Sequence, residues 1–203
     1  MSEANEPQTV TSKPLTKTRV EAFSDGVIAI IITIMVLELH TPDGFDLKAL
    51  TTLWPTLGMY TLSFIYIGIY WNNHHHMLHA VHKVSGGVMW ANLHLLFWLS
   101  LVPFTTRWMG DSHFLHAWPM AVYGFSLLMP AVAYTFLVQA LIAVNGNDSV
   151  FARAIGKDKK GMVSLVIYAS GIGLSFWEPL AGFACYILVA LIWLVPDRRI
   201  ETH

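Results

Sequence analysis

Charged residues are scarce in this chain. Asp, Glu, Lys and Arg make up 12% of its 203 residues, whereas soluble domains carry roughly 25%. Hydrophobic residues make up 55%, a balance that excludes an ordinary soluble domain and predicts an integral membrane protein. The formal net charge is −1, so the chain offers no strongly basic face to nucleic acid, and we expect no nucleic-acid partner.

Features of secreted and catalytic proteins are also missing. The single cysteine, Cys185, cannot form an internal disulfide. Residues 1–18 have no apolar core or cleavage site of a signal peptide, and we expect them to form a flexible cytoplasmic tail. Ser24 and Asp25 are adjacent, so on a helix their side chains diverge by about 100° and cannot form a nucleophile–base pair. With no Gly-rich phosphate loop either, the sequence predicts no enzyme and no cofactor.

Long apolar runs are present, and they predict an all-α membrane protein with six transmembrane helices in residues 19–203. Thr18 and Glu21 have the spacing of a capping box, which predicts that the first helix begins near Arg19. Pro130 is expected to kink the fourth helix. The predicted helices cover about 19–39, 51–77, 88–106, 117–144, 161–177 and 179–195.

The basic residues predict the orientation. With six spans, both termini lie on one side of the membrane, and that side holds ten Lys and Arg residues. The other side holds two, Lys48 and Arg107. This bias places both termini in the cytoplasm, in a multi-pass protein of the plasma membrane. The ten residues are Lys13, Lys17, Arg19, Lys83, Arg153, Lys157, Lys159, Lys160, Arg198 and Arg199.

The first helix carries an unusual stripe. Gly26, Ile30, Thr33 and Leu37 follow steps of four, three and four residues, so they share one helix face. Ordinary helix packing also produces such stripes. Around a fourfold axis, however, four copies would form a tube with apolar constrictions at Ile30 and Leu37 and a ring of Thr33 hydroxyls between them. Apolar constrictions can gate by dewetting, and oxygen rings can replace part of a cation's hydration shell.

Asp25 lies off this stripe, near the start of the apolar run. A carboxylate in the membrane interior costs about 2.5 kcal/mol or more unless it is paired or hydrated. We therefore expect a buried polar clamp that braces the first helix, with a hydrated interfacial carboxylate as the alternative. The expected partners come from the ends of the second and third helices, namely Trp71, His74, His75, Trp90, Asn92 and His94.

The motif Arg19-x-x-x-Phe23-Ser24-Asp25, followed by an apolar helix, resembles the signature of the transmembrane protein 175-like potassium channels. Three further features strengthen the resemblance. They are Trp71-x-x-His74 after the second helix, Asn92 in the third, and Pro103-Phe104-x-Thr106 at its end.

The resemblance implies a homotetramer of six-span subunits that conducts potassium in preference to sodium, with the first helix lining the pore. The family lacks the Thr-Val-Gly-Tyr-Gly filter, and this sequence has no such run. Carried over, Ile30, Thr33 and Leu37 face the pore, and Gly26 lies at its cytoplasmic start. Arg19, Phe23, Ser24 and Asp25 are structural by the same resemblance, with Trp71, His74, His75, Asn92 and His94 as their partners. The implied partners are potassium ions, the lipid bilayer and further copies of the chain.

One departure concerns the first constriction, which is Ile30 here, whereas some relatives carry Leu at that position. The degree of selectivity and the tightness of the gate therefore stay open.

The histidines suggest alternative functions for the protein. His75 and His79 have a spacing that can bind one metal, and they suit a metal-ion transporter or, with pairs from facing helices, a haem protein. A proton-coupled secondary transporter is a third alternative, although no internal repeat is visible. Glu38, with Asp43 and Asp46, would lie at the outer mouth, either enriching cations or as solvated loop charges. The histidines in question are His74, His75, His76, His79, His82 and His94.

Overall fold

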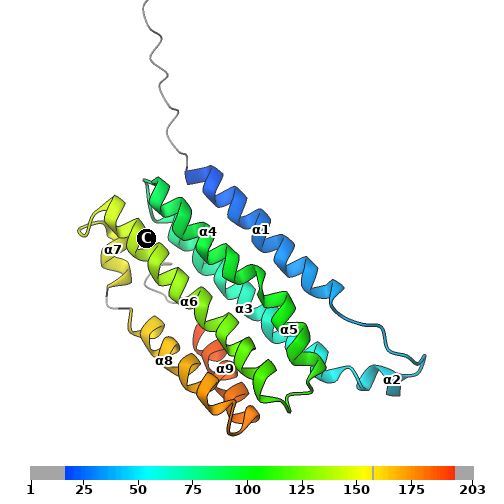
Figure 1. Cartoon of the computed structure of the whole chain (residues 1–203). Helices are drawn as coiled ribbons and strands as arrows, with labels where there is room; N and C mark the ends of the chain where they lie inside the picture. The colour runs from blue at the N-terminus through cyan, green and yellow to red at the C-terminus, as the bar shows by residue number, and fades with distance from the viewer. Residues whose placement is uncertain (1–16, 157, 195–203) are drawn as a thin grey trace, which may run out of the picture.

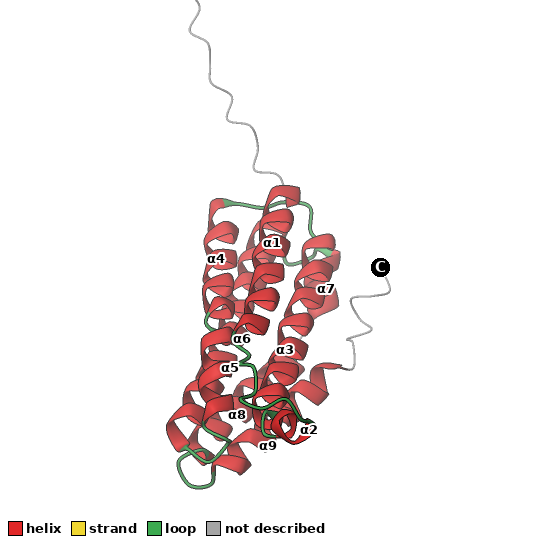
Figure 2. Ribbon diagram, turned by 90° about the vertical axis from the view of Figure 1, so that its right-hand side faces the viewer, coloured by secondary structure: helices red, strands yellow, loops and turns green. Residues whose placement is uncertain are grey.

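The computed structural model describes residues 17–156 and 158–194, apart from the side chain of Ala154. All regular secondary structure within these residues is helical (Figure 1, Figure 2). Most of the predicted tail and Val195 lie outside the described residues, as do Lys13, Lys157, Arg198 and Arg199 of the charge count. The helices are α1 (Lys17–Leu37), α2 (Leu47–Thr51), α3 (Trp54–His79), α4 (Gly86–Ser100), α5 (Val102–Asp111), α6 (Ala117–Asn145), α7 (Val150–Ile155), α8 (Lys159–Leu174) and α9 (Pro179–Leu194).

The start of α1 differs from the prediction. The helix already includes Lys17 and Thr18, so Thr18 does not cap it, and the capping-box prediction is wrong. A side-chain contact with α3 stabilises this first turn instead. The Lys17 ammonium donates to the carbonyl oxygens of His79 and Val81, at 3.1 Å each. The beginning of α1 is therefore tied to the end of α3.

Two short helices were not predicted. The Asp46 side chain accepts a hydrogen bond from the Ala49 backbone N–H at 2.8 Å and caps α2. The Ser149 hydroxyl accepts from the Ala152 N–H at 3.1 Å and caps α7. Asp and Ser are favoured at this position because they satisfy the unpaired N–H groups of the first turn. Both helices are too short for hydrophobic periodicity, so only their caps carried a sequence signal.

The third predicted helix is divided into α4 and α5 at Leu101. Pro103 explains the break, because it has no N–H to donate and lies in the first turn of α5, where a helix does not need that N–H. The predicted end at 106 is also wrong, since α5 continues to Asp111. Pro130, in contrast, lies inside the uninterrupted helix α6, so no helix break accompanies the expected kink.

Three helical stretches are long and apolar enough to cross a membrane: Lys17–Leu37, Gly86–Asp111 and Ala117–Asn145. Helix α9 is apolar but shorter, with 16 residues. Helix α3 is long enough at 26 residues, but its end carries two Asn and three consecutive His residues, which make it less apolar. The described chain is an all-helical, multi-pass membrane protein, and the count of six spans stays a prediction.

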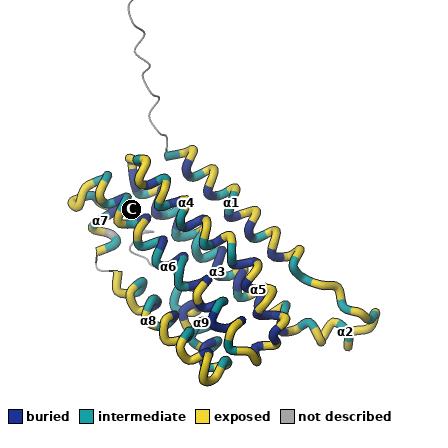
Figure 3. The backbone as a smooth tube through the Cα atoms, in the orientation of Figure 1, coloured by how far each residue is buried: buried dark blue, intermediate teal, exposed yellow. Residues whose placement is uncertain are grey.

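The long helix α6 links the two halves of the bundle, with α4 on one side and α8 on the other (Figure 1). One core cluster includes residues of α1, α3, α4 and α6, and the other includes residues of α3, α6, α8 and α9. Helix α1 buries only one face, against α3 and α4, and its other face is exposed (Figure 3). The buried residues of α1 are Val20, Ser24, Ile28, Ile31 and Met35.

A close approach between α6 and α9 gives a first testable prediction. Gly124 lies against the fully buried ring of Tyr186, and a Cβ at this position would overlap that ring. Gly124→Ala is therefore expected to lower the free energy of unfolding by about 1–3 kcal/mol, as overpacking does. Thermal unfolding in detergent measures the effect. Gly173→Ala in α8 is the control, because its Cβ would meet nothing within 4 Å. Equal melting temperatures for both variants would contradict the tight packing.

Candidate functional site on helix α1

The stripe predicted on the first helix lies on the exposed face of α1. Gly26, Ile30, Thr33 and Leu37 are all exposed in the single subunit, with Ile30 58% and Leu37 79% accessible. Such large apolar side chains need a cover of lipid or protein in a membrane protein. Within the described part of the chain, this face is thus left for the bilayer or for other subunits.

Thr33 is the polar member of this face. Its hydroxyl donates to the carbonyl oxygen of Ile30 at 2.9 Å, one turn back along α1. A threonine hydroxyl has one proton, so this bond leaves the oxygen able only to accept hydrogen bonds or to contact a cation. The exposed face therefore presents an oxygen with free lone pairs between two bulky apolar side chains.

The opposite face of α1 is held by a buried hydrogen-bond chain. The Ser24 hydroxyl donates to the Val20 carbonyl, and the Asn92 amide N–H donates to the Ser24 oxygen, each at 2.8 Å. Asn92 Oδ1 can only accept, so His74 Nε2 must be the donor of the third bond, also at 2.8 Å. The side chains of Ser24, Asn92 and His74 are all buried, and the hydrogen bonds between them join α1, α4 and α3.

A second, more exposed connection runs beside it. Trp71 donates its indole N–H to Asp25 Oδ1 at 3.1 Å and stacks on His75, whose ring centroid lies 6.2 Å away. His75 Nδ1 is 3.4 Å from a carboxylate oxygen of Glu21. Glu21 was not among the predicted site residues. Its place one turn before Asp25, on the same side of α1, was a signal that could have found it.

The structure separates the predicted motif into two groups. Ser24 and Asp25 face α3 and α4 and bond to Asn92 and Trp71. Arg19 and Phe23 are exposed, and Phe23 is 53% accessible. The polar clamp therefore has Ser24 as its buried centre. Of the partners expected for Asp25, Trp71 does bond to it, whereas His74 and Asn92 belong to the hydrogen-bond chain of Ser24.

The predicted position of His94 is wrong. It was expected near Asp25, but its Nε2 accepts a hydrogen bond from the Trp98 indole at 2.8 Å, and its ring stacks on Phe136 of α6. Residues 92 and 94 point about 200° apart on a helix, so they cannot both face α1. Trp90, the other expected donor, is 75% exposed.

The acidic residue at the other end of α1 is paired. Glu38 Oε2 accepts from the Arg107 guanidinium of α5 at 2.8 Å. Arg107 also lies 3.0 Å from the His40 ring and 3.8 Å from the Asp111 carboxylate. An arginine beside Glu38 reduces the attraction of this carboxylate for cations, and the role of the acidic residues at the outer mouth stays a prediction.

The histidines are dispersed among different contacts. His74 is buried against Asn92, whereas His75 stacks on His79 at 6.2 Å. Over residues 17–156 and 158–194, no group of three or more His, Cys, Asp or Glu side chains is placed to hold a metal ion. The metal-transporter alternative therefore has no ligand set in this region.

Comparisons with known proteins confirm the family that the Arg19-to-Asp25 motif resembles. A family model described as "Endosomal/lysosomal potassium channel TMEM175" matches residues 19–103, from the start of the motif into α5. The chain is similar to the human "Endosomal/lysosomal proton channel TMEM175", at 38% identity over 85 residues, which is 36% of this chain and 17% of the human protein.

Bacterial proteins match over a longer region. Potassium channel B446_29190 of Streptomyces collinus is 38% identical over 129 residues, 58% of this chain and 60% of that protein. The crystal structure of a lysosomal potassium-selective channel TMEM175 homolog from Chamaesiphon minutus superposes with a TM-score of 0.79. It is 26% identical and covers 89% of this chain and 97% of that one.

Potassium channel HX13_20290 of Chryseobacterium sp. (strain P1-3) is 53% identical over 187 residues, 92% of this chain and 97% of that protein. This family is one of channels and not of enzymes. With nearly the whole length of such a relative matched, the chain belongs to the TMEM175 family of potassium channels.

Proposed function

We propose that four copies of the chain form a potassium-selective channel whose pore is lined by the exposed stripe of α1. The observation that carries this proposal is the asymmetry of α1. Its inner face is fixed by the buried Ser24–Asn92–His74 chain, whereas Ile30, Thr33 and Leu37 are uncovered. The bacterial relatives are named as potassium channels, which supports the choice of ion.

The geometry of a helix gives the proposed pore its layers. At about 1.5 Å per residue, Thr33 lies about 4.5 Å along the axis from Ile30 and about 6 Å from Leu37. Rings of Ile30 and Leu37 would form two apolar constrictions, with four hydroxyl oxygens between them. Because the Thr33 proton is bonded to the Ile30 carbonyl, these oxygens would accept from water or contact a partly dehydrated cation.

The proposed orientation places both termini in the cytoplasm of a cell whose plasma membrane holds the channel. Helix α1 begins at the same end of the bundle as α4 and α7 (Figure 1). Three basic residues are located at this end: Lys17 in α1, Lys83 in the α3–α4 loop and Arg153 in α7. Lys48 and Arg107 are associated with the opposite end of α1: Lys48 is in α2, the next helix along the chain, and Arg107 bonds to Glu38, just after α1. The positive-inside rule places the first group in the cytoplasm.

Reversal potentials test the proposal. Purified full-length protein in liposomes, under opposed potassium and sodium gradients, is expected to give a reversal potential near that of potassium. Thr33→Ala removes the hydroxyl ring and should lower the potassium-to-sodium permeability ratio severalfold.

Thr61→Ala is the matched control. Thr61 is also exposed and donates its hydroxyl to the carbonyl one turn back, but it lies on α3. Equal potassium-to-sodium selectivity in Thr33→Ala and Thr61→Ala would indicate that another helix lines the pore. No flux from the protein, together with stoichiometric bound metal, would favour the histidine-based transporter.

A further inference from the structure

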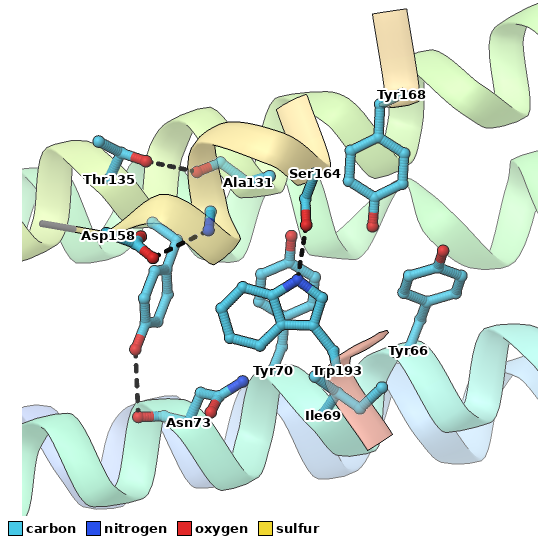
Figure 4. Close-up of a pocket in the computed structure, with 12 residues that line it drawn as sticks. Tyr66, Ile69, Tyr70, Asn73, Ala131, Thr135, Asp158, Ser164, Tyr168 and Trp193 are labelled. Carbon is cyan, nitrogen blue, oxygen red and sulfur yellow. Dashed lines mark hydrogen bonds between the residues drawn. The ribbon is translucent and has the colours of Figure 1, made fainter. Parts of the chain in front are cut away.

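A small cavity lies between α3, α6, α8 and α9 (Figure 4). Its volume is about 40 Å³, and none of its lining residues belongs to α1. Four tyrosines and one tryptophan supply most of its wall. The aromatic residues are Tyr66, Tyr70, Tyr134, Tyr168 and Trp193.

One acidic side chain lines this aromatic space. Asp158 precedes α8, and its Oδ1 accepts a hydrogen bond from the Gly161 N–H at 2.8 Å. Figure 4 shows Asp158 and Asn73 toward one end of the cavity, with the Tyr66 and Tyr168 hydroxyls turned toward each other at the other end. The second carboxylate oxygen of Asp158 is not needed for the helix cap, so it can meet a ligand.

Two of the tyrosine hydroxyls are already used in holding the walls. Tyr134 donates to the backbone carbonyl of Asn73 at 3.3 Å, and Tyr66 donates to the carbonyl of Tyr186. The Trp193 indole donates to the Ser164 hydroxyl at 2.8 Å. These bonds fix the rings around the space, so the cavity is preformed.

One aromatic residue that lines the cavity, Trp193, already contacts the ammonium group of Lys160, although this lysine does not itself line the cavity. The Lys160 nitrogen lies 4.6 Å from the centroid of the Trp193 ring, within the range of a cation–π interaction. Aromatic faces beside a carboxylate are the usual chemistry for binding organic ammonium ions. An inorganic cation needs many oxygen ligands to replace its hydration shell, and these walls are mostly carbon.

We propose that this cavity binds a primary alkylammonium group. A bound water needs about 10–15 Å³ of such space, so the cavity holds about three waters, or an ammonium with one or two carbons. The group can come from a free small amine or from the ethanolamine headgroup of a lipid. Asp158 neutralises its charge, and the tyrosine rings cover its carbons.

Thermal unfolding of the purified full chain in detergent tests the proposal. Ethylammonium chloride is added and compared with sodium chloride at equal concentration, and phosphatidylethanolamine is compared with phosphatidylcholine. At least one of the two ammonium probes is expected to raise the melting temperature above its control.

Substitutions of residues that line the cavity test whether the ammonium group binds there. Asp158→Asn keeps a residue that caps helices well but removes the charge, so it should weaken binding about tenfold. Tyr70→Leu removes one wall and is also expected to weaken binding. Asp148→Asn, in the exposed loop before α7, is the charge control and should leave binding unchanged.

The two sources are distinguished by the probes. A response to phosphatidylethanolamine alone identifies a lipid headgroup, whereas a response to ethylammonium identifies free amines as ligands. A response no larger than that to sodium chloride and phosphatidylcholine would overturn the proposal. So would equal binding in Asp158→Asn and Asp148→Asn.

Discussion

Asn92→Leu is expected to lower the free energy of unfolding by about 1–3 kcal/mol, because it leaves the buried His74 N–H without a partner. Ser24 loses one bond but keeps the one to the Val20 carbonyl. Asn92 accepts from His74 Nε2 and donates to Ser24, both at 2.8 Å, and it is 2% exposed. Leucine has the same branching at Cγ and the same side-chain length, so it is the nearest apolar match in shape, although its methyl groups are bulkier. Loss of this one amide should therefore loosen α4 from both α1 and α3.

Chemical or thermal unfolding in detergent measures this loss. Asn72→Leu is the matched control, because Asn72 lies on α3 with an intermediate exposure and outside the buried chain. The double variant Ser24→Ala with Asn92→Leu should lose less than the sum of the single changes, because removing both partners leaves fewer unpaired groups. A loss no greater than that of Asn72→Leu would mean that the buried chain contributes little to stability.

Ile30→Ala and Leu37→Ala are each expected to raise potassium conductance, by about tenfold if the dewetting barrier falls by about 1.4 kcal/mol. Truncation widens the proposed constrictions and lets water enter. Potassium-to-sodium preference should fall at the same time, because hydrated ions of both kinds would pass. Single-channel currents in planar bilayers, recorded from wild type and both variants, measure conductance and selectivity together.

Ile28→Ala is the control for the pore variants. Ile28 lies two residues from Ile30 but is only 1% exposed, in the core beneath α1. It should lose about 2–5 kcal/mol of stability, as buried truncations do, without widening the pore. Ile30 and Leu37 are largely exposed in the subunit, so their truncation should leave a smaller cavity. Unchanged currents in both pore variants would show that α1 does not form the constriction.

Much of the helical framework could be predicted from the sequence, because it depends on local patterns. Apolar runs give the long helices, and steps of three and four residues place Ile30, Thr33 and Leu37 on one face. The family could also be recognised from the Arg19-to-Asp25 motif, and the comparisons confirm it. Local patterns failed at α2 and α7, which are too short for a period, and at the break between α4 and α5.

The partners within the site were decided by tertiary structure. From sequence, Asp25 was the residue in need of a buried partner, because an intramembrane carboxylate is costly. In the fold, Asp25 lies near the surface and bonds to Trp71, and the buried centre is Ser24, whose small hydroxyl fits between α3 and α4. Likewise, Glu38 meets Arg107, which is distant in sequence.

By itself, the sequence determined the membrane class, the membership of Ile30, Thr33 and Leu37 in one face of α1, and the family, since composition and spacing are properties of the chain alone. Only the tertiary structure decided which side chains meet: His74 with Asn92, Trp71 with Asp25, and the tyrosines with Asp158 around a cavity. The physical reason is that these contacts join different helices. Their partners depend on how the helices rotate and pack against one another, and no spacing along one helix specifies that.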